Sequence, residues 1–182
     1  MSEVTWFRFG ADGQWAVRSM SAIIGAPIAS GSAALAITPE PLVAADVLVL
    51  RGVASNVRYA KRTELAELRA VQEGLGRPAA AMAALLPISK SAGWWLLAQD
   101  ERREIFEEQS RHHSIGVRYL PEIARKLYHC RDLGEDFDFL TWFEFAPAHE
   151  MLFNELLDEL RASREWTYVT REIDIRLTRV EG

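Results

Sequence analysis

The stretch FDFLTWFEF, residues 137–145, alternates with the two-residue period of a β-strand. The alternation predicts that one face of the strand carries Phe137, Phe139, Thr141, Phe143 and Phe145. An aromatic face of this kind is usually the core of a sheet, so taken alone it predicts a strand and no site. The stretch decides the fold because strands and helices follow one another regularly on both sides of it.

Three elements are predicted before this strand. Residues 80–90 (AAMAALLPISK) favour a strand, with Pro87 near its end or at a sheet edge because proline cannot donate to a ladder. Residues 99–119 favour a helix, since acidic residues occupy the first turn and Pro121 follows the end. Residues 125–131 (RKLYHCR) favour a short strand.

Two elements are predicted after it. Residues 147–162 form an expected helix that begins at a proline, and its apolar stripe carries Leu152, Leu156, Leu157 and Leu160. Residues 166–180 form an expected strand with Ile173, Ile175 and Leu177 on one face. From residue 80 the order is therefore β-α-β-β-α-β, which is the α+β, ferredoxin-like arrangement of two helices on one face of an antiparallel sheet.

The first part of the chain is harder to interpret. Residues 3–9 and 14–18 flank a glycine-containing turn and predict a hairpin, and residues 46–60 predict a strand. A helix is expected over 61–73, whereas 20–44 are rich in small residues and receive no assignment. This pattern suggests a shortened ferredoxin-like half.

Composition excludes several classes of protein. The chain has 182 residues, 21 Lys plus Arg and 26 Asp plus Glu, so its net charge of −5 and lack of a basic stripe argue against nucleic-acid binding. A single cysteine, Cys130, rules out an intrachain disulfide and a cysteine metal cluster. No signal-like or membrane-spanning segment is evident, which predicts a cytoplasmic protein. No linker separates residues 1–78 from 79–182, so we expect one compact unit.

Two adjacent histidines stand out in SRHHSIGVRYLPEIARKLYHC, residues 110–130. On a continuous helix, at about 100° per residue, His112 shares a side with Ile105, Gln109, Ile115 and Gly116, and His113 points elsewhere. Gly116 leaves space one turn from His112 for a flat macrocycle against the helix backbone. A lone helical histidine is more often a packed core residue, and spacing alone leaves both interpretations open.

Four longer runs carry a family resemblance. KSAGWWLLAQDERREIFEEQSRHHSIG, ARKLYHCRDLG, FDFLTWFEF and REWTYVTREIDIRL together resemble the chlorite dismutase family of haem proteins. The resemblance covers essentially residues 80–180, and more weakly the run LRGVASNVRYAKR. It implies two ferredoxin-like halves of the dimeric α+β barrel type, the first of them shortened. The short chain resembles the dimeric branch, which implies a homodimer that binds haem b.

The resemblance also implies roles for single residues. His112 matches the axial ligand of the haem iron, and Glu165 matches the carboxylate that accepts a hydrogen bond from its other ring nitrogen. Arg125 matches the catalytic cation on the opposite, distal side of the haem. Lys90, Trp94 and Trp95 match residues at the haem edge near a propionate. The remaining cofactor-binding positions implied in this way are Ile88, Gly116, Leu127, Thr141 and Phe143.

The implied reaction converts chlorite to chloride and dioxygen. In the family, chlorite transfers an oxygen atom to iron, and the resulting ferryl species and hypochlorite recombine. A carboxylate bonded to His112 makes the imidazole more basic and so favours high-valent iron. The permanent charge of Arg125 suits an oxyanion such as chlorite and helps to retain hypochlorite.

The same resemblance leaves room for a different activity. Related coproheme decarboxylases carry a radical-forming tyrosine just before a Pro-x-Ser-Lys motif, where this chain has Leu86, and they lack an arginine like Arg125. Both differences argue against decarboxylation. Peroxidase-like activity stays open as well, as does a dimer that binds or senses haem without turnover.

Overall fold

The computed structural model describes residues 3–29, 31–40, 48–54 and 74–180. Eight strands of these residues close into an antiparallel barrel in the order β1-β3-β2-β8-β5-β7-β6-β4. The strands are β1 (Val4–Gly10), β2 (Trp15–Ile24), β3 (Ala34–Thr38), β4 (Val49–Ala54), β5 (Met82–Lys90), β6 (Ile123–His129), β7 (Phe139–Phe145) and β8 (Val169–Arg179). The protein is therefore a mixed α+β structure built around one closed sheet.

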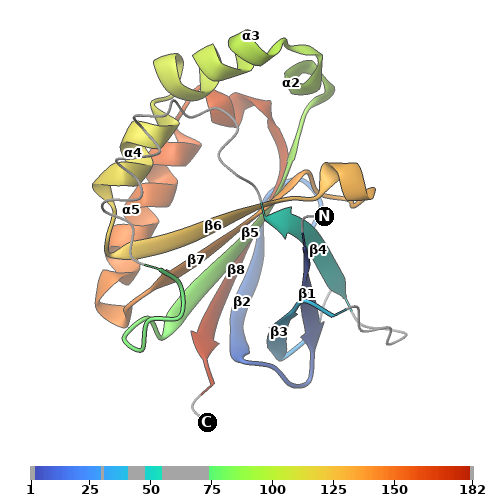
Figure 1. Cartoon of the computed structure of the whole chain (residues 1–182), viewed down its shortest axis with the longest axis vertical. Helices are drawn as coiled ribbons and strands as arrows, with labels where there is room; N and C mark the ends of the chain where they lie inside the picture. The colour runs from blue at the N-terminus through green and yellow to red at the C-terminus, as the bar shows by residue number, and fades with distance from the viewer. Residues whose placement is uncertain (1–2, 30, 41–47, 55–73, 181–182) are drawn as a thin grey trace.

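Most helices gather along one flank of the barrel, while the short turn over 131–133 lies beside β4 (Figure 1). Between β5 and β6 lie α2 (Ala92–Leu96), α3 (Gln99–Arg103), the π-helix η1 (Glu104–Gln109) and α4 (His112–Arg118). Between β7 and β8 lie η3 (Pro147–His149), α5 (Glu150–Arg161) and the 3₁₀ turn η4 (Glu165–Tyr168), and η2 (Arg131–Leu133) precedes β7. In Figure 1, α4 and α5 run beside each other over the outer face of the sheet.

Alternation along the strands supplies two separate hydrophobic cores. The inward residues fill the barrel, among them Phe7, Trp15, Leu35, Trp142 and Ile175. Outward residues of β5 and β7, among them Leu86, Phe143 and Phe145, pack under α4 and α5 against residues such as Phe153 and Leu157 of α5. Each strand of this part of the sheet thus contributes to both cores because successive side chains point to opposite faces.

The predicted hairpin between residues 3–9 and 14–18 is wrong. Both segments are strands, but β3 lies between them and pairs with each. A Cβ atom at Gly13 would lie 2.2 Å from the carbonyl oxygen of Leu35, so the glycine allows the β3 backbone to pass close to the turn. The glycines of this turn are typical of a local hairpin, but Gly13 instead allows close contact with the backbone of β3.

Two details of the central strands also differ from expectation. Pro87 lies in the interior of β5, which pairs with both β7 and β8 and is not an edge strand. The pairs with β8 include Leu85 and Ile88, on either side of the proline, so the ladder tolerates the missing donor. Phe137 precedes β7 and packs inside the barrel, so it does not share the outer face with Phe139 and Phe143.

The predicted order of elements from residue 80 agrees with the structure. Strand β5, the helices α2 to α4, strands β6 and β7, helix α5 and strand β8 follow one another, and the four strands are neighbours in the sheet. Of the expected strand over 46–60, residues 49–54 form β4, while 55–60 and the expected helix over 61–73 lie outside the described residues. Among the described residues no helix combines the length and apolarity needed to cross a membrane.

Candidate functional site

The helix that carries the two histidines is interrupted. Residues 99–119 were expected to form one helix, but α3 passes into a π-helix and then stops, and Arg111 adopts a left-handed conformation with φ of 55°. His112 is therefore the first residue of a new helix, α4. The predicted common side with Ile105 and Gln109 is wrong because those two residues precede the break.

His112 is held by a buried carboxylate from a distant part of the chain. Its Nδ1 lies 2.7 Å from Oε2 of Glu165, which belongs to the 3₁₀ turn before β8. The ring also stacks on Phe106, with ring centroids 4.3 Å apart. With Nδ1 engaged by Glu165, Nε2 is the ring nitrogen left to act as a ligand.

Lys90 is the third of three linked ionisable side chains, after His112 and Glu165. Its ammonium group forms an ion pair with the other oxygen of Glu165, and both side chains are almost fully buried. Burial alone would raise the pKa of Glu165, but His112 and Lys90 outweigh it and lower the pKa to about 2. Burial lowers the pKa of Lys90, opposed by Glu165. Glu165 is thus a permanent anion at neutral pH, bonded on both oxygens.

Arg125 reaches from the sheet to the helix at Gly116. It lies on β6, and its guanidinium approaches so closely that a Cβ atom at position 116 would be 3.1 Å from Nη1. Burial lowers the pKa of Arg125, and the negative charge of Glu165 opposes this shift. One region between β6 and α4 therefore contains the Arg125 guanidinium, Gly116 and the His112–Glu165 pair.

The sheet face beneath this region contains other predicted cofactor-binding residues, from β6, β7 and β5. Arg125 is paired with Phe143, and Leu127 is paired with Thr141. Directly paired residues of antiparallel strands share a face, so these four side chains form one surface. The same outer face continues on β5, where Leu86 pairs with Thr141, and Ile88 pairs with Phe139.

Trp94 and Trp95 lie on α2 beside the linked ionisable side chains. The Lys90 ammonium is 3.5 Å from the ring centroid of Trp94, which is buried, and the indole N–H of Trp94 has no hydrogen-bond partner among the described residues. The indole of Trp95 stacks on Phe139 and donates to Asp138 at 3.2 Å. The structure places Lys90 against Glu165 and Trp94, and its expected position near a propionate stays a prediction.

Sequence reasoning missed several residues that shape the site. Phe106 contacts the His112 ring, and Ser110 accepts a hydrogen bond from the backbone N–H of Glu165 at 2.8 Å. Asp138 is buried and accepts from the Lys90 backbone N–H at 2.7 Å, which ties β5 to the start of β7. These contacts join segments far apart in sequence, so no local pattern signals them.

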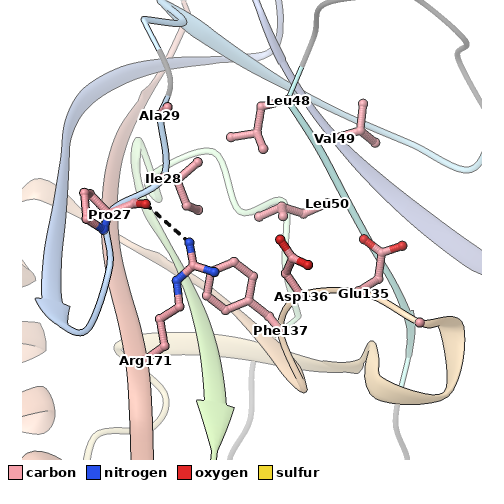
Figure 2. Close-up of a pocket in the computed structure, with 11 residues that line it drawn as sticks. Pro27, Ile28, Ala29, Leu48, Val49, Leu50, Glu135, Asp136, Phe137 and Arg171 are labelled. Carbon is pink, nitrogen blue, oxygen red and sulfur yellow. Dashed lines mark hydrogen bonds between the residues drawn. The ribbon is translucent and has the colours of Figure 1, made fainter.

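A separate open cavity of about 440 Å³ lies at one end of the barrel. Figure 2 shows Arg171 extending across it toward Pro27, beside Phe137 and the acidic pair Glu135 and Asp136. Arg171 donates to the backbone carbonyls of Ala26 and Pro27, and Glu135 is paired with Arg51. None of the predicted site residues lines this cavity, and Arg171 and Glu135 are both engaged within the protein.

The residues between β6 and α4 fit a haem group. An imidazole oriented by a carboxylate is a typical axial ligand of haem iron, and the glycine one turn away has no side chain, so the flexible Arg125 guanidinium lies against its backbone. The outer sheet face opposite supplies apolar and aromatic side chains, with a cation among them. This donor set matches a flat, largely apolar cofactor with a polar distal side.

Comparisons with known proteins identify the family of the chain. The chain is similar to the dimeric chlorite dismutase of Nitrobacter winogradskyi, with 52% identity, 97% of this chain and 99% of that chain covered, and a TM-score of 0.92. A chlorite dismutase structure from Candidatus Nitrospira defluvii in complex with imidazole is 27% identical, with a TM-score of 0.58, over 79% of this chain and 56% of that one.

A curated relative is the chlorite dismutase of Ideonella dechloratans, 33% identical over 87 residues. That match covers 48% of this chain and spans only 28% of the relative's length. The family model described as chlorite dismutase matches residues 43–180, which is most of the chain. The chain belongs to the chlorite dismutase family.

Proposed function

We propose that the protein is a haem b-dependent chlorite dismutase that converts chlorite to chloride and dioxygen. One observation carries the proposal: a histidine bonded to a buried anion lies in the same region as an arginine that reaches across from the sheet. The family membership supports the same reaction.

On the proximal side, His112 would hold the haem iron through Nε2. Glu165 accepts a hydrogen bond from Nδ1–H, which fixes the tautomer and makes the ring a stronger electron donor. Lys90 compensates the buried charge of Glu165, so the carboxylate stays ionised. The haem, when bound, supplies the redox chemistry, and the protein supplies binding, orientation and electrostatics.

On the distal side, Arg125 would attract chlorite and keep a negatively charged product close. Its guanidinium stays cationic at neutral pH, and its five donors suit an oxyanion. Leu127, Thr141, Phe143 and Ile88 would form the largely apolar surface around it. An apolar surround strengthens the attraction between a cation and an anion because water screens it less.

We infer that Gly116 would press against the macrocycle and that Trp94 and Trp95 would border its edge. The unpartnered indole N–H of Trp94 is a suitable donor for a propionate. Lys90, whose ammonium group lies over the Trp94 ring and pairs with Glu165, would lie at the same edge near a propionate.

A coproheme decarboxylase is the second candidate, and Leu86 argues against it. Leu86 is buried on the outer sheet face opposite Thr141, where the resemblance would require a tyrosine for radical transfer. A leucine side chain has no oxidisable group. A peroxidase-like enzyme or a haem-sensing dimer would use the same proximal residues, so turnover is the property that separates them.

We further propose a homodimer in the cytoplasm, with two ferredoxin-like halves, residues 1–78 and 79–182, in one compact unit. Similarity to a structure described as dimeric supports the first point. The sheet order β8-β5-β7-β6, with helices between β5 and β6 and between β7 and β8, supports a ferredoxin-like second half.

The test is oxygen evolution from chlorite by haem-reconstituted protein on a Clark electrode. We expect rapid release of about one dioxygen per chlorite, as the implied stoichiometry requires. His112→Ala should lose the haem spectrum, and Arg125→Ala should keep haem but lose turnover. Matched controls are His149→Ala at the start of α5 and Lys126→Ala, the exposed neighbour of Arg125.

Correctly loaded protein that releases no oxygen would exclude the dismutase and favour a haem sensor. Retention of the wild-type haem spectrum by His112→Ala would remove His112 as the ligand.

A further inference from the structure

Helix α4 begins at the proposed iron ligand without an ordinary cap. The first amide groups of a helix have no partner within the helix and are usually satisfied by a Ser, Thr, Asp or Asn side chain at the N-cap. Here the N-cap residue is Arg111, in the left-handed conformation, and its side chain makes no capping hydrogen bond. An arginine side chain cannot accept a hydrogen bond.

Glu107 supplies the missing acceptors from the preceding π-helix. Its Oε2 accepts from the backbone N–H of His113 at 2.8 Å, and its Oε1 accepts from the Ser114 hydroxyl at 2.9 Å. The backbone carbonyl of Glu107 accepts from the N–H of Arg111 at 2.8 Å. A negative charge at this end of a helix is also favourable to the helix dipole.

The same segment contacts the ligand and its carboxylate directly. Phe106, the neighbour of Glu107, stacks on the His112 ring with an interplanar angle of 23°. Ser110, at the end of the π-helix, binds the backbone N–H of Glu165. Residues 106, 107 and 110 therefore touch His112, the start of α4 and Glu165, respectively. π-Helices are rare and occur often at functional sites.

We propose that Glu107 is a positioning residue for the haem ligand: by capping α4 from the π-helix it fixes the direction of the His112 ring relative to Glu165. The inference rests on the haem-binding function proposed above. The Glu107 carboxylate bonds to His113 and Ser114, not to the His112 ring, so it acts through the helix start. Without the cap, the first turn of α4 can fray, and the bond between Nδ1 and Glu165 loses its fixed geometry.

The first measurement uses the full-length chain without haem. In ¹⁵N-labelled protein the Nδ1 proton of His112, shared with Glu165, should resonate far downfield, and the amide of His113 should exchange slowly. We expect Glu107→Ala to weaken or remove both signals. Glu108→Ala is the matched control because Glu108 is the adjacent, exposed glutamate, and it should leave both signals unchanged.

The second measurement uses the haem-loaded protein. Because partners that orient a ligand typically alter metal affinity by about 10–100-fold, we expect Glu107→Ala to release haem to apomyoglobin about 10-fold faster. The iron–histidine stretching frequency should fall and the reduction potential should rise, which a general loss of stability would not produce. Glu107→Gln keeps one acceptor oxygen for two donors and should show smaller changes in the same direction.

A folded Glu107→Ala protein with an unchanged Nδ1 proton signal and unchanged haem release would overturn the proposal. If the alanine variant does not fold, unchanged signals in Glu107→Gln would overturn it equally. If the wild-type chain takes up no haem, the proposed function fails, whereas the measurement on the haem-free chain still decides the role of Glu107.

Discussion

Glu165 is the residue that unites the site, because it is nearly inaccessible to solvent and has a partner on each oxygen. The sequence resemblance paired it with His112, 53 residues earlier, and the structure brings the two together. The contact with its second partner, Lys90, was not predicted from the sequence. A buried carboxylate needs enough positive charge around it, and that requirement appears only once burial is known.

Removing Lys90 should destabilise the protein strongly. Lys90→Met leaves a buried carboxylate with a single ionisable partner, and breaking a buried pair in this way typically costs about 3–5 kcal/mol. The double variant Lys90→Met/Glu165→Gln should recover part of the loss because no uncompensated charge remains. Urea denaturation of the haem-free chain measures both.

The matched control is Arg118→Met, which removes the exposed ion pair with Glu159. Exposed pairs contribute about 0.2–1 kcal/mol, so this variant should unfold at nearly the wild-type urea concentration. Equal losses in the Lys90 and Arg118 variants would show that burial of the Lys90 pair has no energetic importance.

Cys130 should be chemically inert in the folded protein. Burial, aided by the charge of Glu135, raises the pKa of its thiol from 9.0 to about 12. Because the thiolate is the reactive form, a thiol reagent such as DTNB at pH 8 should react only after unfolding. Rapid modification of the native chain would contradict this expectation.

The same shift makes stability depend on pH. The raised pKa means that the folded state holds its proton when the unfolded state has lost it, so stability falls as pH rises from 9.0 to about 12. Urea midpoints measured at about pH 8 and about pH 10.5, below and within that window, should differ more for the wild-type chain than for Cys130→Ala.

At the scale of elements, periodicity predicted most strands and helices, and the break before α4 escaped it. Arg111 adopts a positive φ without being glycine, and the cap that supports the break comes from Glu107, outside the new helix. Neither feature has a sequence signature. The charge pattern of residues 99–119 suits one continuous helix, and tertiary contacts with Glu165 override that preference.

Helix α4 offers a test that separates folding from function. Gly116→Ala should stabilise the helix by up to about 1 kcal/mol, the usual difference in helix propensity. The new Cβ would lie 3.1 Å from Nη1 of Arg125, so the flexible guanidinium must move. The methyl group would also lie where we propose that the macrocycle contacts the helix. We therefore expect unchanged or higher thermal stability together with weaker haem uptake, measured by absorbance titration.

Gly93→Ala in α2 is the matched control, since a Cβ there meets only the Ser91 hydroxyl, at 3.6 Å. It should gain similar helix propensity without affecting haem uptake. If both variants bind haem as the wild-type chain does, the close approach of Arg125 to Gly116 has no part in the site.

At the scale of the whole molecule, sequence order predicted the succession of elements from residue 80 but not the closure of the barrel. Closure depends on pairing between β2 and β8 and between β4 and β6, which joins the two ends of the chain. The predicted hairpin failed for the same reason, because β3 enters from further along the chain and takes the position beside β2. The residues of the turn between β1 and β2 carry no information about β3, which comes later in the sequence.

Because strands of both halves close the sheet, we predict that residues 79–182 do not fold alone. Without the first half, β8 and β6 become open edges, and Ile173, Ile175 and Leu177 lose Phe7, Trp15 and Leu35 as neighbours in the barrel core. The truncated chain should aggregate or lack a cooperative thermal transition by circular dichroism. A soluble, cooperatively folding fragment would show that the second half is an independent domain.

The separation of the barrel interior from the helix-covered face also bears on protein engineering. Along β7, Trp142 packs inside the barrel, while its neighbours Thr141 and Phe143 face the helices. A mutant library restricted to Thr141 and Leu127, which are only partly buried, would alter the surroundings of Arg125 and leave both hydrophobic cores intact. New substrates, such as other oxyanions or peroxides, can therefore be sought in this chain without redesigning the scaffold that holds it together.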